Sequence, residues 1–120
     1  MLVFFVARLN ARLHARATLQ SFEPGQIVYE EQSHNLTDVS FHLVVRTSAH
    51  SVWLRPIGKT ETELGNGQGS VLPDTQRQAP DRSIFRMKIQ KDSDGSQCAF
   101  DRFRVYRIFD GVAKYVNHWD

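Results

Sequence analysis

The chain has 120 residues, of which 41% are hydrophobic and 23% charged, enough for one domain with its own core and too few for two. Its single cysteine, Cys98, excludes an internal disulfide and a cysteine-based zinc site within one chain. The net charge of +2 is unevenly spread, because residues 1–20 contain three arginines and no acid. Low cysteine usage favours a reducing, cytoplasmic setting.

Residues 1–20 predict a basic amphipathic helix. Arginines recur there at i, i+4 and i+8, apolar residues line another side, and no Gly or Pro interrupts the stretch. A strand is the competing interpretation for residues 2–6, whose Val-Phe-Phe-Val run favours β-structure. The apolar start is too short to span a bilayer, and its charges follow the apolar run instead of preceding it, so we expect no membrane anchor. The arginines are Arg8, Arg12 and Arg16, and the apolar residues Val6, Leu9 and Leu13.

After a Pro-Gly turn at residues 24–25 the apolar pattern changes to a period of two, which is typical of half-buried strands. Residues 58–82, with a glycine-rich run and two prolines, predict a long, polar, flexible insertion. Five or six short strands must curl to close a core, so we expect residues 21–120 to form one mainly β domain. The expected fold is a small SH3-like, strongly bent antiparallel barrel. Strands are predicted at 26–30, 39–47, 51–57, 84–90 and about 97–109, with a core of Ile27, Tyr29, Phe41, Leu43, Val45, Val52, Leu54, Phe85, Met87, Ile89, Phe103 and Val105.

No motif for catalysis or metal binding is found in the sequence. The glycine-rich run at 65–69 lacks the following helix and the lysine of a phosphate-binding loop. The five histidines have no metal-ligand spacing, and no Gly-x-Ser-x-Gly elbow is present. Cys98 alternates into a strand and is expected to be a small buried hydrophobe. We therefore expect a non-enzymatic protein with no metal and no cofactor.

Basic and aromatic residues in the last two predicted strand regions carry the most information about function. Arginines beside aromatics on a sheet face are typical of surfaces that bind single-stranded nucleic acid. An ordinary solvated face with interleaved aspartates is the alternative. The three N-terminal arginines could contact phosphate, lie on a membrane surface or serve solubility, and three charges are few for membrane anchoring. The candidates are Arg102, Arg104 and Tyr106, which share one strand face, and the outward-facing Arg86 and Lys88.

Four segments stand in this order along the chain: PGQIVY (24–29), LTDVSFHLV (36–44), VWLRPIG (52–58) and YRIFDGVAKY (106–115). Together they resemble a family of small proteins of unknown function that phages, prophages and plasmids encode. The resemblance covers roughly residues 22–117 outside the predicted insertion, and a basic helical stretch ahead of the first segment matches residues 8–20. It implies a mobile-element origin and a bacterial or phage cytoplasmic setting, and it supplies no activity.

The leading hypothesis is therefore a binding module that contacts nucleic acid or a nucleoprotein through a basic sheet face. The runner-up is a protein–protein inhibitor that a mobile element makes against a host defence complex. An enzyme is third, because no catalytic pattern supports it.

Overall fold

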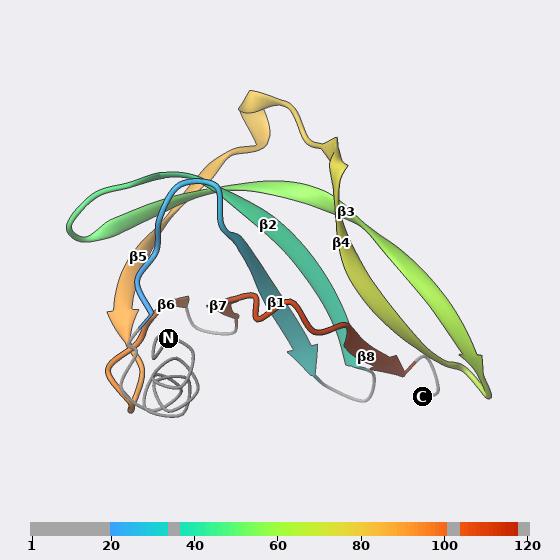
Figure 1. Ribbon diagram of the computed structural model, residues 1–120. Helices are drawn as coiled ribbons and strands as arrows, with labels where there is room; N and C mark the ends of the chain where they lie inside the picture. The colour runs from blue at the N-terminus through green and yellow to red at the C-terminus, as the bar shows by residue number, and fades with distance from the viewer. Residues whose placement is uncertain (1–19, 34–36, 101–103, 118–120) are drawn as a thin grey trace, which may run out of the picture.

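The computed structural model describes residues 20–33, 37–100 and 104–117, and this part of the chain is mainly β (Figure 1). The prediction of a bent antiparallel sheet is confirmed, with eight strands described instead of five or six. The predicted helix at 1–20 lies almost wholly outside the described residues. In chain order the elements are β1 (Ile27–Ser33), β2 (Thr37–Thr47), β3 (Ser51–Gly65), β4 (Gln68–Gln78), the 3-10 helix η1 (Asp81–Ser83), β5 (Phe85–Lys91), β6 (Gln97–Phe100), β7 (Val105–Ile108) and β8 (Lys114–Asn117).

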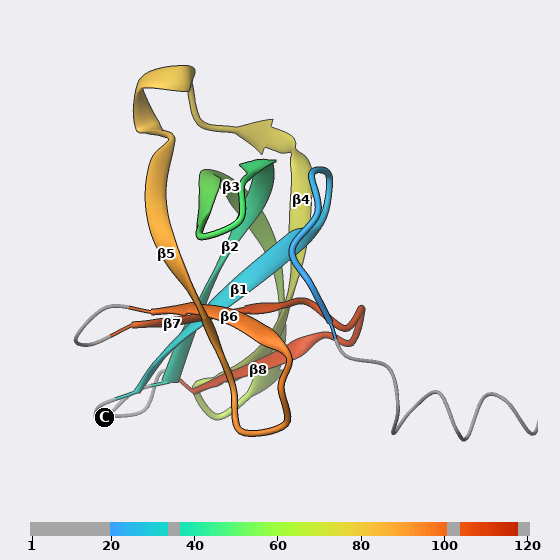
Figure 2. The same ribbon diagram turned by 90° about the vertical axis from the view of Figure 1, so that its left-hand side faces the viewer.

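The strands pair into a closed barrel, and an additional pairing between β2 and β3 divides this barrel into two smaller rings. The order around it is β1-β2-β8-β4-β3-β5-β6-β7, with β7 pairing back to β1. Because β2 also pairs with β3, the barrel contains a six-stranded ring (β1, β2, β3, β5, β6, β7) and a four-stranded ring (β2, β3, β4, β8). The two rings share β2 and β3, which form the arch in Figure 1. Figure 2 views the six-stranded ring from the side of β5.

Each ring encloses its own hydrophobic cluster, so β2 is buried on both faces. On β2, Phe41 belongs to the cluster of the four-stranded ring, whereas Val44 belongs to that of the six-stranded ring. This corrects part of the expected core: Val28 and Val44 are fully buried, while Tyr29 and Leu43 are only half-buried. Alternation along a strand shows which residues share a face. It does not predict which of them are fully buried when both faces of the strand are covered. Of the expected core, Phe41, Val52, Leu54 and Met87 are confirmed as buried, Ile27, Val45, Phe85, Ile89 and Val105 are half-buried, and Phe103 lies outside the described residues.

Most of residues 58–82, where a long, polar, flexible insertion was predicted, lie in a long hairpin of β3 and β4 and in η1. Gly65 pairs with Gln68, which leaves Asn66 and Gly67 as a two-residue turn. Both turn residues have positive φ, +55° and +74°, as a type I′ hairpin turn requires. The glycine-rich run is therefore turn chemistry, and β8 supplies the second partner strand for β4.

The turn gives a stability prediction. Gly67→Ala places a Cβ on a backbone with φ of +74°, so we expect the free energy of unfolding to fall by about 1 kcal/mol, measured by urea denaturation. Asn66→Gly is the control. Because glycine adopts positive φ freely, this variant should lower the free energy of unfolding by only about a few tenths of a kcal/mol. Equal stability of both variants would contradict the turn.

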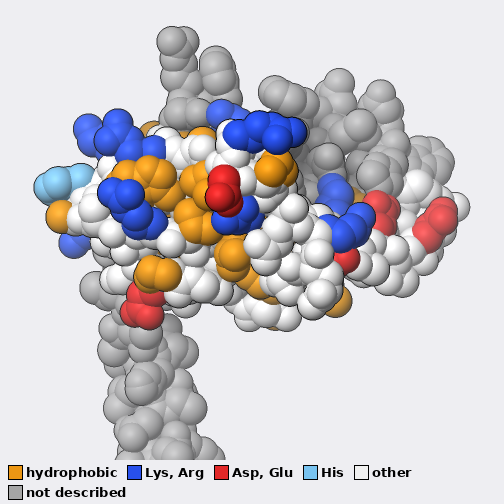
Figure 3. All heavy atoms as spheres, turned by 90° about the horizontal axis from the view of Figure 1, so that it is seen from above, with side chains coloured by type: hydrophobic (Ala, Val, Ile, Leu, Met, Phe, Trp, Pro, Cys, Tyr) orange, Lys and Arg blue, Asp and Glu red, His pale blue; other side chains and the backbone are white. Residues whose placement is uncertain are grey.

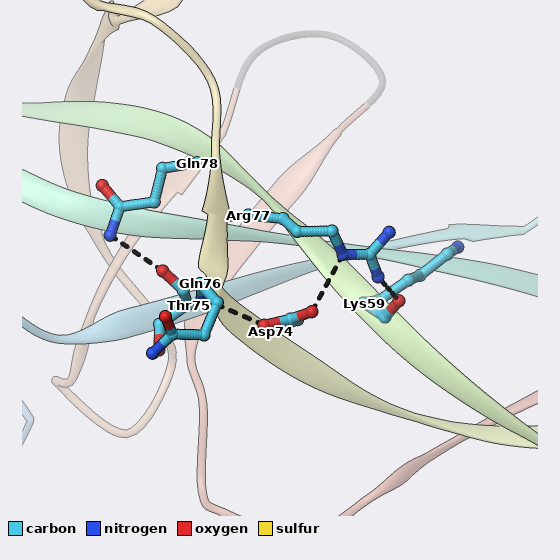
Figure 4. A network of polar contacts seen from close by, with 6 residues as sticks. All are labelled: Lys59, Asp74, Thr75, Gln76, Arg77 and Gln78. Carbon is cyan, nitrogen blue, oxygen red and sulfur yellow. Dashed lines mark hydrogen bonds and ion pairs between the residues drawn. The ribbon is translucent and has the colours of Figure 1, made fainter.

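A bulge interrupts the pairing of β4 with β3, and a network of polar contacts surrounds it (Figure 4). The register passes from Gly58↔Asp74 to Ile57↔Gln78, so three residues of β4 have no partner on β3. Asp74 holds this bulge: its carboxylate accepts from the Gln76 backbone N–H at 3.0 Å and from Arg77 Nε at 2.8 Å. A Cβ on Gly58 would lie 2.9 Å from Arg77 Nε, so the close approach depends on glycine.

Candidate functional site

A cross-strand row of basic and aromatic side chains lies on the outer face of the six-stranded ring. Trp53 on β3 is the register partner of Arg46 on β2 and of Arg86 on β5. A register shift between Val44 and Arg46 precedes the row on β2, and Arg46 Cζ lies 4.0 Å from the centroid of the Trp53 ring. A guanidinium at this distance makes a cation–π contact.

Next to this row the surface has an open hollow of about 370 Å³. Ser51 lies two residues before Trp53 on β3 and pairs with Lys88, which lies two residues after Arg86 on β5. The hollow therefore continues the row along the same two strands. We call Arg46, Trp53, Arg86 and Lys88 the outer basic face. Lining the hollow are His50, Ser51, Arg86 and Lys88.

The two cations that β5 contributes to this face, Arg86 and Lys88, are exposed to solvent. Within residues 20–33, 37–100 and 104–117, neither Arg86 nor Lys88 forms an ion pair. The acid of η1, Asp81, is instead bound by Arg55 at 2.9 Å. Figure 3 looks down on the arch and shows Lys and Arg side chains around hydrophobic ones, with the red of acidic side chains also present among them.

The structure separates the residues that the sequence grouped together. Arg86 and Lys88 are exposed, as expected, but Tyr106 is only 1% exposed and lies in the core of the six-stranded ring. Its expected place on a binding face is therefore wrong, since β7 turns this side chain inward. Arg104 is exposed, and its positive charge helps to lower the pKa of His42, a buried residue that packs against Tyr106. Arg8, Arg12, Arg16 and Arg102 lie outside the described residues.

Sequence reasoning missed the aromatic centre of the face. The alternation that sets Trp53 opposite Val52 and Leu54 does indicate an outward tryptophan, since Val52 and Leu54 are buried. The position of Arg46 beside Trp53 could not be predicted from the sequence, because it depends on the register shift between β2 and β3. His50 and Ser51 reach the site because the turn between β2 and β3 ends beside β5.

Two buried polar residues lie inside the six-stranded ring, away from the outer basic face. Glu30 is 3% exposed and accepts a hydrogen bond from Ser40 Oγ at 3.1 Å. His42 is 7% exposed, its Nδ1 has no partner among the described residues, and its ring meets those of Phe85 and Tyr106 edge-on. Burial, and then the charge of Arg104, lower its pKa from 6.5 to about 4, so His42 is neutral at pH 7.

The remaining candidates for chemistry have structural roles. Cys98 is buried, and burial followed by the charge of Asp92 raises its pKa, which keeps it a thiol at neutral pH. Asp110 forms a turn by accepting from the Val112 backbone N–H and from Lys114 Nζ, both at 3.0 Å. Among the described residues, no group of three or more His, Cys, Asp or Glu is placed to hold a metal ion.

In the described ranges, no helix is long and apolar enough to cross a membrane. Compared with family models, with curated proteins and with solved structures, the chain has no significant match. The outer basic face is therefore the main basis for a functional inference.

Proposed function

We propose that this protein is a non-enzymatic binding module that contacts nucleic acid, or a nucleoprotein, through its outer basic face. The observation that carries the proposal is the row of Arg46, Trp53 and Arg86, continued by Lys88 at the hollow. Cations without local carboxylate partners attract phosphates, and phosphate contacts supply most sequence-independent affinity for nucleic acid. The aromatic ring between them adds a surface on which a base can stack.

Three further expectations belong to this proposal. The small, strongly bent sheet would act as an SH3-like scaffold whose outer face is left for binding. The resemblance to proteins of phages, prophages and plasmids would place it in a bacterial cytoplasm as the product of a mobile element. The arginines at positions 8, 12 and 16 would add phosphate contacts to those of the outer basic face.

The test is the salt dependence of binding to single- and double-stranded DNA and RNA. We expect Arg86→Ala/Lys88→Ala to weaken binding about tenfold and to reduce the slope of log K against log salt by about one to two, measured between about 50 and about 200 mM salt. Each lost phosphate contact removes released counterions, which is why the slope falls.

Lys91→Ala is the matched control for Lys88→Ala. Both are exposed lysines of β5, but Lys91 does not line the hollow. It should leave affinity and slope close to those of the wild type. The proposal would be refuted if the wild type did not bind nucleic acid at low salt. It would also be refuted if Lys88→Ala and Lys91→Ala lost the same amount of affinity.

One observation favours the second candidate function, a protein–protein inhibitor of a host defence complex. The β3–β4 hairpin carries two exposed leucines, Leu64 (57%) and Leu72 (46%), and the exposed acids Glu61 and Glu63. Apolar and acidic groups on a projecting hairpin suit a protein partner better than a phosphate backbone. Failure to bind nucleic acid at low salt, together with a protein partner that binds this hairpin, would favour the inhibitor.

A further inference from the structure

The indole at the centre of the outer basic face has basic residues on both neighbouring strands. Arg46 reaches it from β2 with its Cζ 4.0 Å from the ring centroid, and Arg86 is its register partner on β5. The cation–π contact restrains the partly exposed ring without using a hydrogen-bond acceptor, so the guanidinium keeps its donors. Aromatic rings and arginine guanidinium groups are the two side-chain types on which unpaired bases stack.

The neighbouring hollow has the donor set of a phosphate site. Its lining offers a guanidinium, an ammonium and a hydroxyl, from Arg86, Lys88 and Ser51, and it includes no carboxylate. Charged donors of this kind bind phosphate oxygens with short, strong hydrogen bonds. Ser51 lies two residues from Trp53 along β3, which separates the two Cα atoms by about 7 Å on the same face of the strand. One nucleotide is long enough to place a base and a phosphate at that separation.

From these two adjoining features we infer that the outer basic face takes a single strand, with an unpaired base stacked against Trp53 and Arg46 and a phosphate of that strand in the hollow. This inference rests on the proposed function and narrows its substrate class. A duplex presents phosphates but keeps its bases stacked on one another, so Trp53 would contribute nothing to duplex binding. Stacking tolerates any base, so the face selects single strands with little preference for sequence.

The experiment measures anisotropy of labelled oligothymidine and oligouridine of about 12 nucleotides, and of a dA·dT duplex of equal length, with the full chain. Trp53→Ala should weaken single-strand binding about 5- to 150-fold and leave the salt slope unchanged. Lys88→Ala should lower the single-strand slope by about 0.7. Trp53→Phe keeps an aromatic ring and should retain most of the affinity. Tryptophan fluorescence should be quenched by the single strand in the wild type and much less in Trp53→Phe, in which Trp119 is the remaining tryptophan.

The outcomes separate this inference from the proposed function. If the wild type prefers the single strand and Trp53→Ala removes that preference while thermal unfolding stays unchanged, the inference stands. If the duplex binds equally well, and binding depends on Arg86 and Lys88 but not on Trp53, the proposed function stands and the single-strand inference is overturned. If neither nucleic acid binds at low salt, both are overturned.

Discussion

Replacing Tyr106 with alanine is expected to lower the free energy of unfolding by about 3–5 kcal/mol, because it removes a large aromatic ring from the core. Tyr106 is 1% exposed and is one of the largest fully buried side chains. Its ring centroid lies 5.1 Å from that of His42 and 6.0 Å from that of Phe85, so truncation leaves a cavity between aromatic neighbours. Urea denaturation of the wild type and the variant measures the difference.

Two controls make this prediction specific to burial. Tyr106→Phe keeps the ring and should retain both the fold and the affinity for nucleic acid. Phe100→Ala removes an aromatic ring from the adjacent strand β6 that is 38% exposed, and it should cost much less than Tyr106→Ala. A folded Tyr106→Ala protein of wild-type stability that no longer bound nucleic acid would show that Tyr106 is a binding residue, as its sequence pattern had indicated.

His42 is expected to make the protein less stable in acid. Its pKa is lowered from 6.5 to about 4 in the folded state, first by burial and second by Arg104. Well above pH 6.5 the imidazole is neutral in both states and contributes no pH dependence. As the pH falls below 6.5 the unfolded chain binds a proton that the folded protein does not, so stability declines and the loss reaches about 3 kcal/mol near pH 4.

The comparison that isolates this effect is His42→Phe, which keeps a ring between Phe85 and Tyr106 but has no titratable group. Carboxylates titrate in the same range and affect both proteins alike, so the difference between the two pH profiles reports the imidazole alone. We expect the profiles, measured by urea denaturation from pH 7 to pH 4, to diverge by about 3 kcal/mol, with the wild type falling faster. Parallel profiles would mean that His42 can be protonated inside the folded ring.

Much of the architecture follows from local pattern. The period of two predicted a mainly β chain, and it oriented β5 correctly, with Met87 buried and Arg86 and Lys88 outward. That strand is covered on one face only, so alternation and burial agree there. The Asn66-Gly67 turn was also present in the sequence as a hairpin signal, and the surrounding glycines and prolines led to the prediction of a flexible connection instead.

The sequence by itself determined that the chain is β-rich and which side chains alternate together along each strand. Only the tertiary structure decided which of the two sets faces a core. On β2 both sets do, because the strand lies between two rings, and Phe41 and Val44 are buried in different clusters. The outer basic face depends on the same long-range pairing: Arg46, Trp53 and Arg86 come from three strands, and only their register brings them together. Register between strands is set by contacts distant in sequence, which a periodicity within one strand does not contain.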